Sequence, residues 1–271
     1  MEERNTETTG AMNPAIIVSA NPVAMAEQAA AEFLRLSEEA IKERGVFLAC
    51  LSGGSTPVLL YDLLADADLY FEKSVFFFGD ERDVPPDHPE SNYRLACEHL
   101  FRSDKGKSST IYRWHTEMRD REETAFEYET TILRISNQFN SVVQRDNFPV
   151  PRFDLILLGI GEDGHTASLF PHTKALHESQ RIAVANFVDR MGIWRYTLTF
   201  PAINNARNII FLAAGEMKAE AVRMAVTGKA DISDIPAAGV RPVEGNITWF
   251  LDEESAMLIS AEVEKFQHQA K

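Results

Sequence analysis

The 271-residue chain has little cysteine, no long apolar run and a deficit of basic residues. Two cysteines, Cys50 and Cys97, are too few for a disulfide framework and suit a reducing compartment, so we expect a cytoplasmic protein. No apolar run approaches the length of a membrane span, and we expect no membrane partner. With 27 Lys and Arg against 41 Asp and Glu, the net charge of −14 argues against nucleic-acid binding.

Several catalytic motifs are also missing. The sequence has no HExxH, no paired CxxC and no dense carboxylate cluster, so we expect no metal site. The GxSxG motif of serine hydrolases is absent. The lysine and the spacing of a GxxxxGK P-loop are absent too.

The composition is that of a globular protein, with 45% hydrophobic and 25% charged residues. Residues 1–14 are polar and lack the apolar core of a signal peptide, and we expect them to form a disordered tail. No stretch rich in Gly, Ser or Pro divides the remainder, so residues 15–271 are predicted to form a single α/β domain.

Strand-like runs alternate with helix-like runs along the chain, which predicts an α/β fold with a mostly parallel sheet and helices on both faces. Strands are expected over Ala15–Ser19, Val46–Leu51, Ser74–Phe78, Phe153–Leu158, Arg181–Asn186, Trp194–Phe200, Ile209–Ala214 and Ile247–Leu251. Helices are expected over Val23–Arg44, from Pro57, over Asn92–Phe101, Glu122–Val143 and Lys218–Val226, and at the C-terminus.

The most informative segment is FDLILLGIGEDGHTASLFP, residues 153–171. A short apolar run predicts a buried strand, and the glycines after it allow a sharp turn. His165 then follows the strand tip, where open α/β sheets bind their ligands. Because histidine titrates near neutral pH, it is a candidate acid or base, with Asp163 beside it as a group that holds the ring or caps a turn.

The same segment matches the GxGxxG dinucleotide fingerprint at Gly159, Gly161 and Gly164. That motif needs a long helix after its third glycine, and here Pro171 stops any helix about two turns after His165. We therefore do not expect a nicotinamide cofactor, because an isolated GxGxxG is weak evidence.

A second signal is the loop Ser52-Gly53-Gly54-Ser55-Thr56-Pro57, which follows a strand and precedes a helix. Thr56 suits the N-cap and Pro57 the first helical position. Free backbone N–H groups and hydroxyls at a positive helix end make a site for an anion, and we expect phosphate to bind there.

Further polar residues follow other strands. Asp80 and Arg82 lie at the end of the strand Ser74–Phe78 in Gly-Asp-Glu-Arg, where an arginine could clamp an anion and an aspartate could orient a base or hydroxyl. Asn92 and Arg94 are possible polar contacts or helix-start residues. Lys218, after the strand Ile209–Ala214, would supply a point charge near a phosphate or lie in solvent.

Taken together, these motifs resemble the 6-phosphogluconolactonase family. The resemblance runs from about Ala15 to the C-terminal helix. It is carried by SGGSTP at 52–57, GDER at 79–82 with PPDHPESNYR at 85–94, GEDGHTASLFP at 161–171, GEMKA at 215–219, AAGVRP at 237–242 and TWFLD at 248–252.

The resemblance implies a Rossmann-like α/β fold, similar to the sugar-phosphate isomerases. It implies hydrolysis of 6-phospho-D-glucono-1,5-lactone to 6-phosphogluconate, the second step of the oxidative pentose phosphate pathway, without a cofactor. The expected partner is this small lactone, and we expect a monomer. His165 is the expected base and Arg82 stabilises the oxyanion or holds the sugar; Gly53, Gly54, Ser55 and Lys218 hold the phosphate.

Two alternatives stay open. Glucosamine-6-phosphate deaminases share these loops but carry a catalytic glutamate five positions after the histidine, where this chain has Phe170, and a tyrosine where it has Arg82. Without that acid, isomerase chemistry should be slower by roughly a hundredfold or more. The other alternative is a non-catalytic protein that binds sugar phosphates.

Overall fold

The computed structural model describes residues 14–145, 147–228 and 230–259. The polar tail expected over residues 1–14 lies outside this range apart from Pro14. Most of the expected C-terminal helix also lies outside it; α8 (Glu253–Ala256) is the part that is described. Among the described residues, no helix has the length and apolar character needed to cross a membrane.

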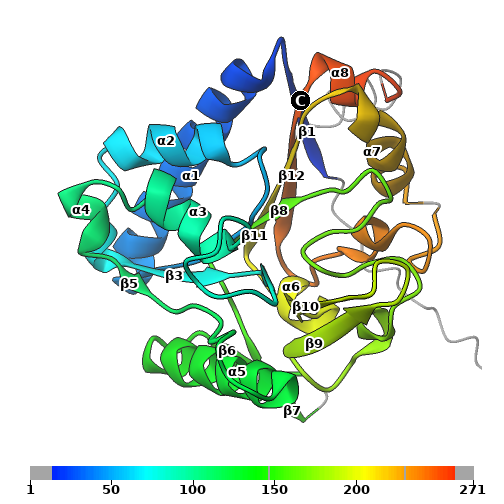
Figure 1. The fold of residues 1–271 in the computed structure, drawn as a ribbon. Helices are drawn as coiled ribbons and strands as arrows, with labels where there is room; N and C mark the ends of the chain where they lie inside the picture. Colours follow the sequence, from blue (N-terminus) through cyan, green and yellow to red (C-terminus); the bar gives the residue numbers. More distant parts are fainter. Residues whose placement is uncertain (1–13, 146, 229, 260–271) are drawn as a thin grey trace, which may run out of the picture.

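Seven parallel strands form the main sheet of the described chain (Figure 1). Every neighbouring pair in it runs parallel, as the sequence pattern predicts. In spatial order the strands are β1 (Ala15–Ser19), β12 (Asn246–Asp252), β11 (Asn208–Ala213), β8 (Leu155–Gly159), β2 (Phe47–Leu51), β3 (Ser74–Phe78) and β5 (Thr110–Ile111).

Helices cover both faces of this sheet, which confirms the predicted fold class. The first group, α1 to α4, lies on one side, and α5 to α7 lie on the other (Figure 1), as right-handed crossovers require when the strand order reverses. Their bounds are α1 Pro22–Arg44, α2 Val58–Asp66, α3 Asn92–His99, α4 Asp104–Lys107, α5 Arg121–Gln138, α6 Phe200–Ile203 and α7 Ala219–Val226. Single 3₁₀ turns are η1 Phe71–Lys73, η2 Lys174–His177, η3 Glu216–Lys218 and η4 Pro236–Gly239.

Local sequence signals explain the long helix α1. The side chain of Asn21 accepts a hydrogen bond from the amide of Ala24 at 2.9 Å, and Pro22 occupies the first turn. Gly45 ends the helix in the left-handed region, with φ of 78°. Buried residues recur at helical spacing along one face, including Phe33 and Ala40. This face packs on the sheet, so α1 matches its predicted range closely.

The central strands are buried because their sequences are continuously apolar. All five residues of β2 and all five of β3 are buried. Burial of one phenylalanine side chain contributes roughly 1.5–3 kcal/mol, and β3 alone buries Phe76, Phe77 and Phe78. A strand covered by helices on both faces needs this pattern rather than alternation.

Two smaller sheets depart from the predicted elements. The expected strands 181–186 and 194–200 are β9 (Ala183–Val188) and β10 (Ile193–Leu198), which pair antiparallel with each other and with β4 (Asp80–Arg82), outside the main sheet. The predicted helix Glu122–Val143 was too long. It ends at Gln138, because Asn140 has a positive φ of 53° and the chain then forms the hairpin β6 (Val142–Arg145) and β7 (Phe148–Pro151).

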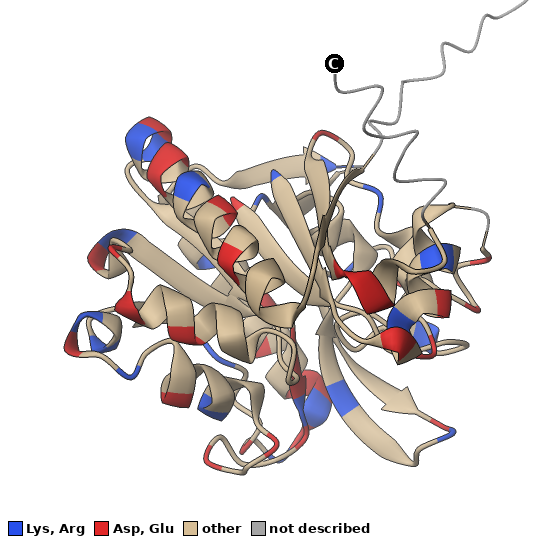
Figure 2. Ribbon diagram, turned by 90° about the horizontal axis from the view of Figure 1, so that it is seen from above, with Lys and Arg blue, Asp and Glu red and all other residues tan. Residues whose placement is uncertain are grey.

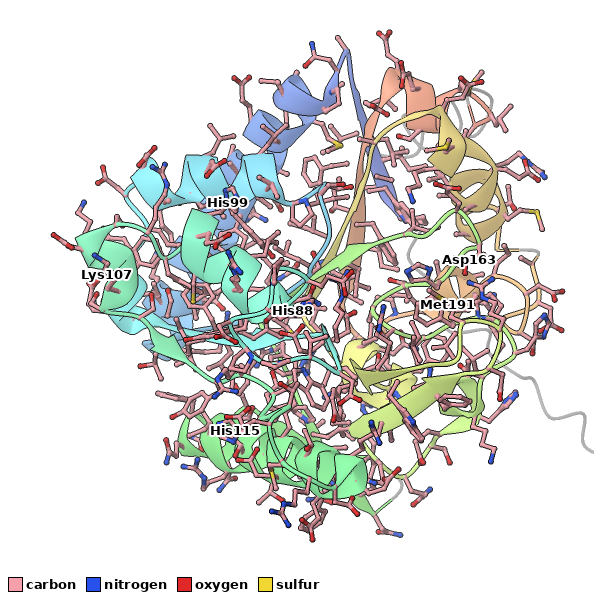
Figure 3. All side chains as sticks on the ribbon, viewed as in Figure 1. His88, His99, Lys107, His115, Asp163 and Met191 are labelled. Carbon is pink, nitrogen blue, oxygen red and sulfur yellow. The ribbon has the colours of Figure 1, made fainter. Side chains whose placement is uncertain are left out.

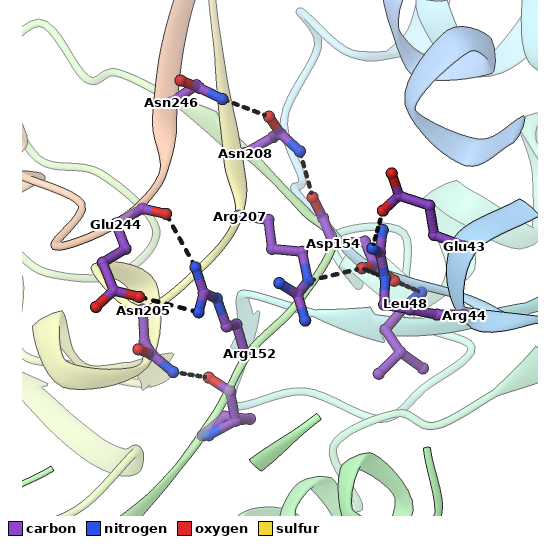
Figure 4. A network of polar contacts seen from close by, with 11 residues as sticks. Glu43, Arg44, Leu48, Arg152, Asp154, Asn205, Arg207, Asn208, Glu244 and Asn246 are labelled. Atoms are coloured by element: carbon purple, nitrogen blue, oxygen red, sulfur yellow. Dashed lines mark hydrogen bonds and ion pairs between the residues drawn. The ribbon is translucent and has the colours of Figure 1, made fainter. Parts of the chain in front are cut away.

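An ion-pair network lies at the amino edge of the sheet (Figure 4). The predicted site residues follow the carboxyl ends of the strands, at the opposite edge. Asp154, 2% exposed, accepts hydrogen bonds from Nε of Arg44 at 2.9 Å and from the amide of Leu48 at 2.8 Å. Nε of Arg207 lies 3.2 Å from the same carboxylate. Elsewhere acidic and basic residues are interspersed along several helices, α1 and α5 among them (Figure 2).

Candidate active site

A cavity of about 200 Å³ lies at the carboxyl edge of the main sheet. Its walls are loops that follow four neighbouring strands, β11, β8, β2 and β3. After β2 the chain moves to β3, whereas after β8 it moves the other way, to β11. The cavity therefore lies at the topological switch point, where α/β sheets bind ligands.

The structure brings most of the predicted site residues to this one cavity. Those that line it are Ser52, Gly53, Gly54, Ser55, Thr56, Asp80, Arg82, His165 and Lys218. Asp163 and Asn92 lie just behind the wall, each in contact with a residue that lines it. Arg94 is not among the lining residues.

His165 and Asp163 form a hydrogen-bonded pair. Nδ1 of His165 lies 2.5 Å from Oδ1 of Asp163, and the His165 amide donates to the same oxygen at 3.2 Å. A tight turn presents the pair: the Gly161 amide donates to the carbonyl of His165 at 2.8 Å, and Gly164 takes a φ of 79°. With Nδ1 bound to a carboxylate, the proton sits on Nδ1 and Nε2 carries the lone pair.

The surroundings of His165 keep the imidazole neutral. Burial lowers its pKa to about 4, and the positive charges of Lys218, Arg195 and Arg82 act in the same direction while Asp80 opposes them. The ring stacks on Phe170, with 4.2 Å between ring centroids and 22° between planes. At pH 7 this histidine can therefore accept a proton rather than carry one.

The glycine-rich loop after β2 leads into α2 without a side chain that caps this helix. The prediction that Thr56 caps the next helix is wrong: α2 begins at Val58, Pro57 occupies the cap position, and no side chain accepts there. The hydroxyl of Ser52 is buried without a hydrogen-bond partner. Gly54 adopts a φ of 87°, which favours glycine. The loop thus offers the positive end of α2 and unshared donors to the cavity.

Asn92 supports this loop from behind. A Cβ on Gly53 would lie 1.8 Å from Oδ1 of Asn92, so only glycine lets the loop pack this closely. The Asn92 side chain donates to the carbonyl of Asp80 at 2.9 Å and to its Oδ1 at 3.2 Å. Oδ2 of Asp80 accepts from the hydroxyl of Ser168 at 2.7 Å. Asn92 therefore couples the loop to Asp80.

The two charged neighbours of Asp80 have different surroundings. Glu81, 3% exposed, accepts from the amides of Asn92 and Tyr93 at 2.7 and 2.9 Å in the first turn of α3, and Ser91 is the N-cap of this helix. Burial raises the pKa of Glu81, and the amide donors oppose that shift. Arg82 lines the cavity and donates to the carbonyl of Glu90 at 2.5 Å.

Arg94 does not line the cavity. Its guanidinium donates to Glu98 at 2.6 Å and to the carbonyl of Asp87 at 2.8 Å, both outside the cavity wall. Its position is that of a surface residue on α3, so the expected contact with substrate is not supported by the geometry.

Sequence reasoning missed Arg195 on β10. Arg195 is the cross-strand partner of Arg82, and Thr197 is the partner of Asp80, so all four share one face of the small sheet. Burial and the charge of Arg82 lower the pKa of Arg195. The sequence does contain an indication of Arg195, because a strand is predicted over 194–200 and the alternation of a strand places Arg195 and Thr197 on one face.

Within the described residues, no group of three or more His, Cys, Asp or Glu side chains is arranged to hold a metal ion. Cys50 and Cys97 are free thiols. Burial raises the pKa of both, so neither is activated as a nucleophile.

The fold and cavity define an α/β protein in which a histidine–aspartate pair and a glycine-rich loop meet at one cavity. Residues 20–249 match the family described as glucosamine-6-phosphate isomerases/6-phosphogluconolactonase, and the chain belongs to that family. A 6-phosphogluconolactonase of Synechocystis sp. is 38% identical over 244 residues, which cover 90% of this chain and 98% of that protein. One from Nostoc sp. is 36% identical over 223 residues, 82% of this chain and 89% of that protein.

Solved structures of 6-phosphogluconolactonases have a similar fold. The 6-phosphogluconolactonase from Trypanosoma brucei has a TM-score of 0.79 at 29% identity, covering 92% of this chain and 99% of its own. The 6-phosphogluconolactonase from Trypanosoma cruzi has a TM-score of 0.81, also at 29% identity, covering 93% and 98%. Both match the whole described fold rather than a fragment.

Proposed function

We propose that the chain hydrolyses 6-phospho-D-glucono-1,5-lactone to 6-phosphogluconate. The observation that carries this proposal is one cavity with two ends. A neutral His165, held by Asp163, faces it from one loop, and the anion loop Ser52–Thr56 with Lys218 lines it from two others. Relatives that carry the 6-phosphogluconolactonase name support the choice of substrate.

The phosphate end of the substrate would be held by the loop before α2. Gly54 and Ser55 offer backbone amides at the start of this helix, whose dipole favours a negative group. Lys218 adds a full positive charge from the loop after β11. Binding energy from this remote group would fix C1 of the lactone against His165.

The reaction would then run on one base. Nε2 of His165 takes a proton from a water molecule as the water oxygen forms a bond to C1. The carbonyl electrons move to oxygen, and Arg82 stabilises that developing charge. When the oxyanion collapses, the bond from C1 to the ring oxygen breaks and the imidazolium returns its proton to that oxygen. Asp163 stabilises the imidazolium in between.

The rival isomerase chemistry lacks a proton carrier at the expected position. Phe170, 5% exposed, stacks on His165 where glucosamine-6-phosphate deaminases are expected to place a glutamate. Lactone opening needs no second acid on a neighbouring carbon, so the arrangement favours hydrolysis over isomerisation.

The test compares two reactions of the same protein. Acid release from freshly made 6-phosphogluconolactone, corrected for spontaneous opening, should be fast, and ammonia release from glucosamine 6-phosphate should be negligible. The reverse result would assign the isomerase activity. Binding of 6-phosphogluconate in a thermal-shift titration without turnover of either substrate would identify a non-catalytic sugar-phosphate protein instead.

We further propose that the reaction serves the oxidative pentose phosphate pathway. The two free thiols suit a reducing compartment such as the cytoplasm. We propose a monomer as the active unit, because a single chain already supplies the candidate base, its carboxylate partner and the anion loop to one cavity.

A further inference from the structure

Asp163 contacts a second charged residue besides His165. Arg190 lies in the turn between β9 and β10, and its guanidinium makes an ion pair with Oδ2 of Asp163. The two carboxylate oxygens are thus divided, with Oδ1 on the imidazole and Oδ2 on the guanidinium. Figure 3 shows Asp163 next to Met191, the residue that follows Arg190 in this turn.

Arg190 also contacts the other neighbour of the imidazole. Its guanidinium carbon lies 5.6 Å from the centroid of the Phe170 ring, a cation–π distance. Phe170 in turn stacks on His165. Four side chains therefore form a closed ring of contacts: His165 to Asp163, Asp163 to Arg190, Arg190 to Phe170, and Phe170 back to His165.

Core packing does not explain this position of Arg190. Its side chain is 49% exposed, and the turn around it is exposed as well, with Met191 at 51%. An exposed arginine usually gains little from one ion pair, since solvent screens it. Here the partner carboxylate is only 22% exposed and already engaged with the candidate base, so the pair acts on a partly desolvated group.

We propose that Arg190 is a positioning residue for the hydrolysis, which holds Asp163 and Phe170 so that the imidazole of His165 presents Nε2 to the cavity. This inference rests on the proposed function. Removal of the outer-shell partners of a metal-ligating histidine typically costs 10- to 100-fold in activity, and we expect an effect of that size for the partners of His165. Arg190 touches neither the cavity wall nor the reacting atoms; it acts through Asp163 and Phe170.

Arg190 also balances charge around the imidazole. His165 is faced by Asp163 on its own loop, by Asp80 and Arg82 on β4, by Arg195 on β10 and by Lys218 after β11. Loss of Arg190 would leave the Asp163 carboxylate unbalanced beside the ring. The added negative field favours the imidazolium, so the pKa of His165 should rise and the acidic limb of the kcat profile should move to higher pH.

The experiment uses the full chain and four variants. Arg190→Gln removes the charge, and Arg190→Lys restores a charge that can reach the carboxylate. Asp189→Asn is the matched control, because it changes a charge in the same turn. Asp163→Asn combined with Arg190→Gln tests whether the two residues act as one unit.

We expect Arg190→Gln to lower kcat about 10- to 100-fold with KM within about twofold, and to shift the acidic limb upward. Arg190→Lys should recover most of kcat, Asp189→Asn should match the native protein, and the double variant should be no slower than Asp163→Asn alone. An NMR titration of the His165 ring should show the same upward shift without any substrate.

The proposal is overturned if Arg190→Gln keeps native kcat and pH profile, or if Asp189→Asn shows the same loss. It is also overturned if the losses in the double variant simply multiply. These results differ from failure of the proposed function, in which the native protein itself would not open the lactone.

Discussion

The Cβ position of Gly161 lies 2.0 Å from Nδ1 of His165 and 2.4 Å from Oδ1 of Asp163. Any side chain at residue 161 would therefore enter the hydrogen bond between His165 and Asp163. We predict that Gly161→Ala lowers kcat at least tenfold, because the ring must rotate away from Asp163. Gly79→Ala is the control, since its Cβ would meet atoms at 3.6 and 3.7 Å, ordinary contact distances. If Gly161→Ala keeps the same kcat as Gly79→Ala, the hydrogen bond between His165 and Asp163 is not needed for turnover.

Lys218 should govern binding rather than turnover. A hydrogen bond to a charged group contributes about 1.5–3 kcal/mol, which corresponds to roughly a 10- to 100-fold change in affinity. We predict that Lys218→Met raises KM for the lactone by that amount while kcat changes less than about threefold. Lys105→Met, which removes an exposed ion pair between Lys105 on α4 and Asp68, should leave KM unchanged. An unchanged KM for Lys218→Met would remove this lysine from the phosphate site.

The pH profile should report the depressed pKa of His165. In the proposed mechanism the neutral imidazole is the active form, so activity is present above its pKa and is lost as pH falls through it. With a pKa of about 4, kcat/KM should stay level from pH 7 to about 5 and then fall. Arg195→Gln removes a positive charge that lowers this pKa, so the fall should occur at higher pH. A native limb near 6.5 would show a histidine whose pKa is not lowered by burial and by the nearby positive charges.

The network at the opposite edge of the sheet should affect stability alone. Asp154→Asn leaves Arg44 and Arg207 beside one another without their shared carboxylate. Breaking a buried pair in this way costs about 3–5 kcal/mol in the free energy of unfolding. Urea denaturation measures it, with Glu39→Gln as control, because its exposed pair with Arg35 should contribute less than about 1 kcal/mol. A loss below about 1 kcal/mol in the free energy of unfolding for Asp154→Asn would show that the network is not stabilising.

Much of the site could be predicted because its chemistry is encoded locally. The buried strands β2, β3 and β8 are continuous apolar runs, and the polar loops that follow them carry His165, Asp80 and the glycine pair. Parallel strands bring their carboxyl ends to one edge, so these loops had to meet.

The remainder depends on pairing between distant segments. The strand β4 has three residues, too few for a periodic signal, and its partner β10 comes from far along the chain. Arg195 and Arg190 therefore reach the site through antiparallel pairing between β10 and β4, which the predicted strand over 194–200 did not by itself reveal. The end of α5 was misjudged because Val142 and Val143 extend the apolar pattern into a hairpin.

The turnover number of His165→Gln with freshly prepared 6-phosphogluconolactone tests the central claim most directly. This variant keeps a polar side chain of similar reach but cannot act as a base. We predict that kcat falls by about 10²- to 10⁴-fold while 6-phosphogluconate still binds. A kcat within a few-fold of the native value would show that another group activates water, and the account given for this cavity would be wrong.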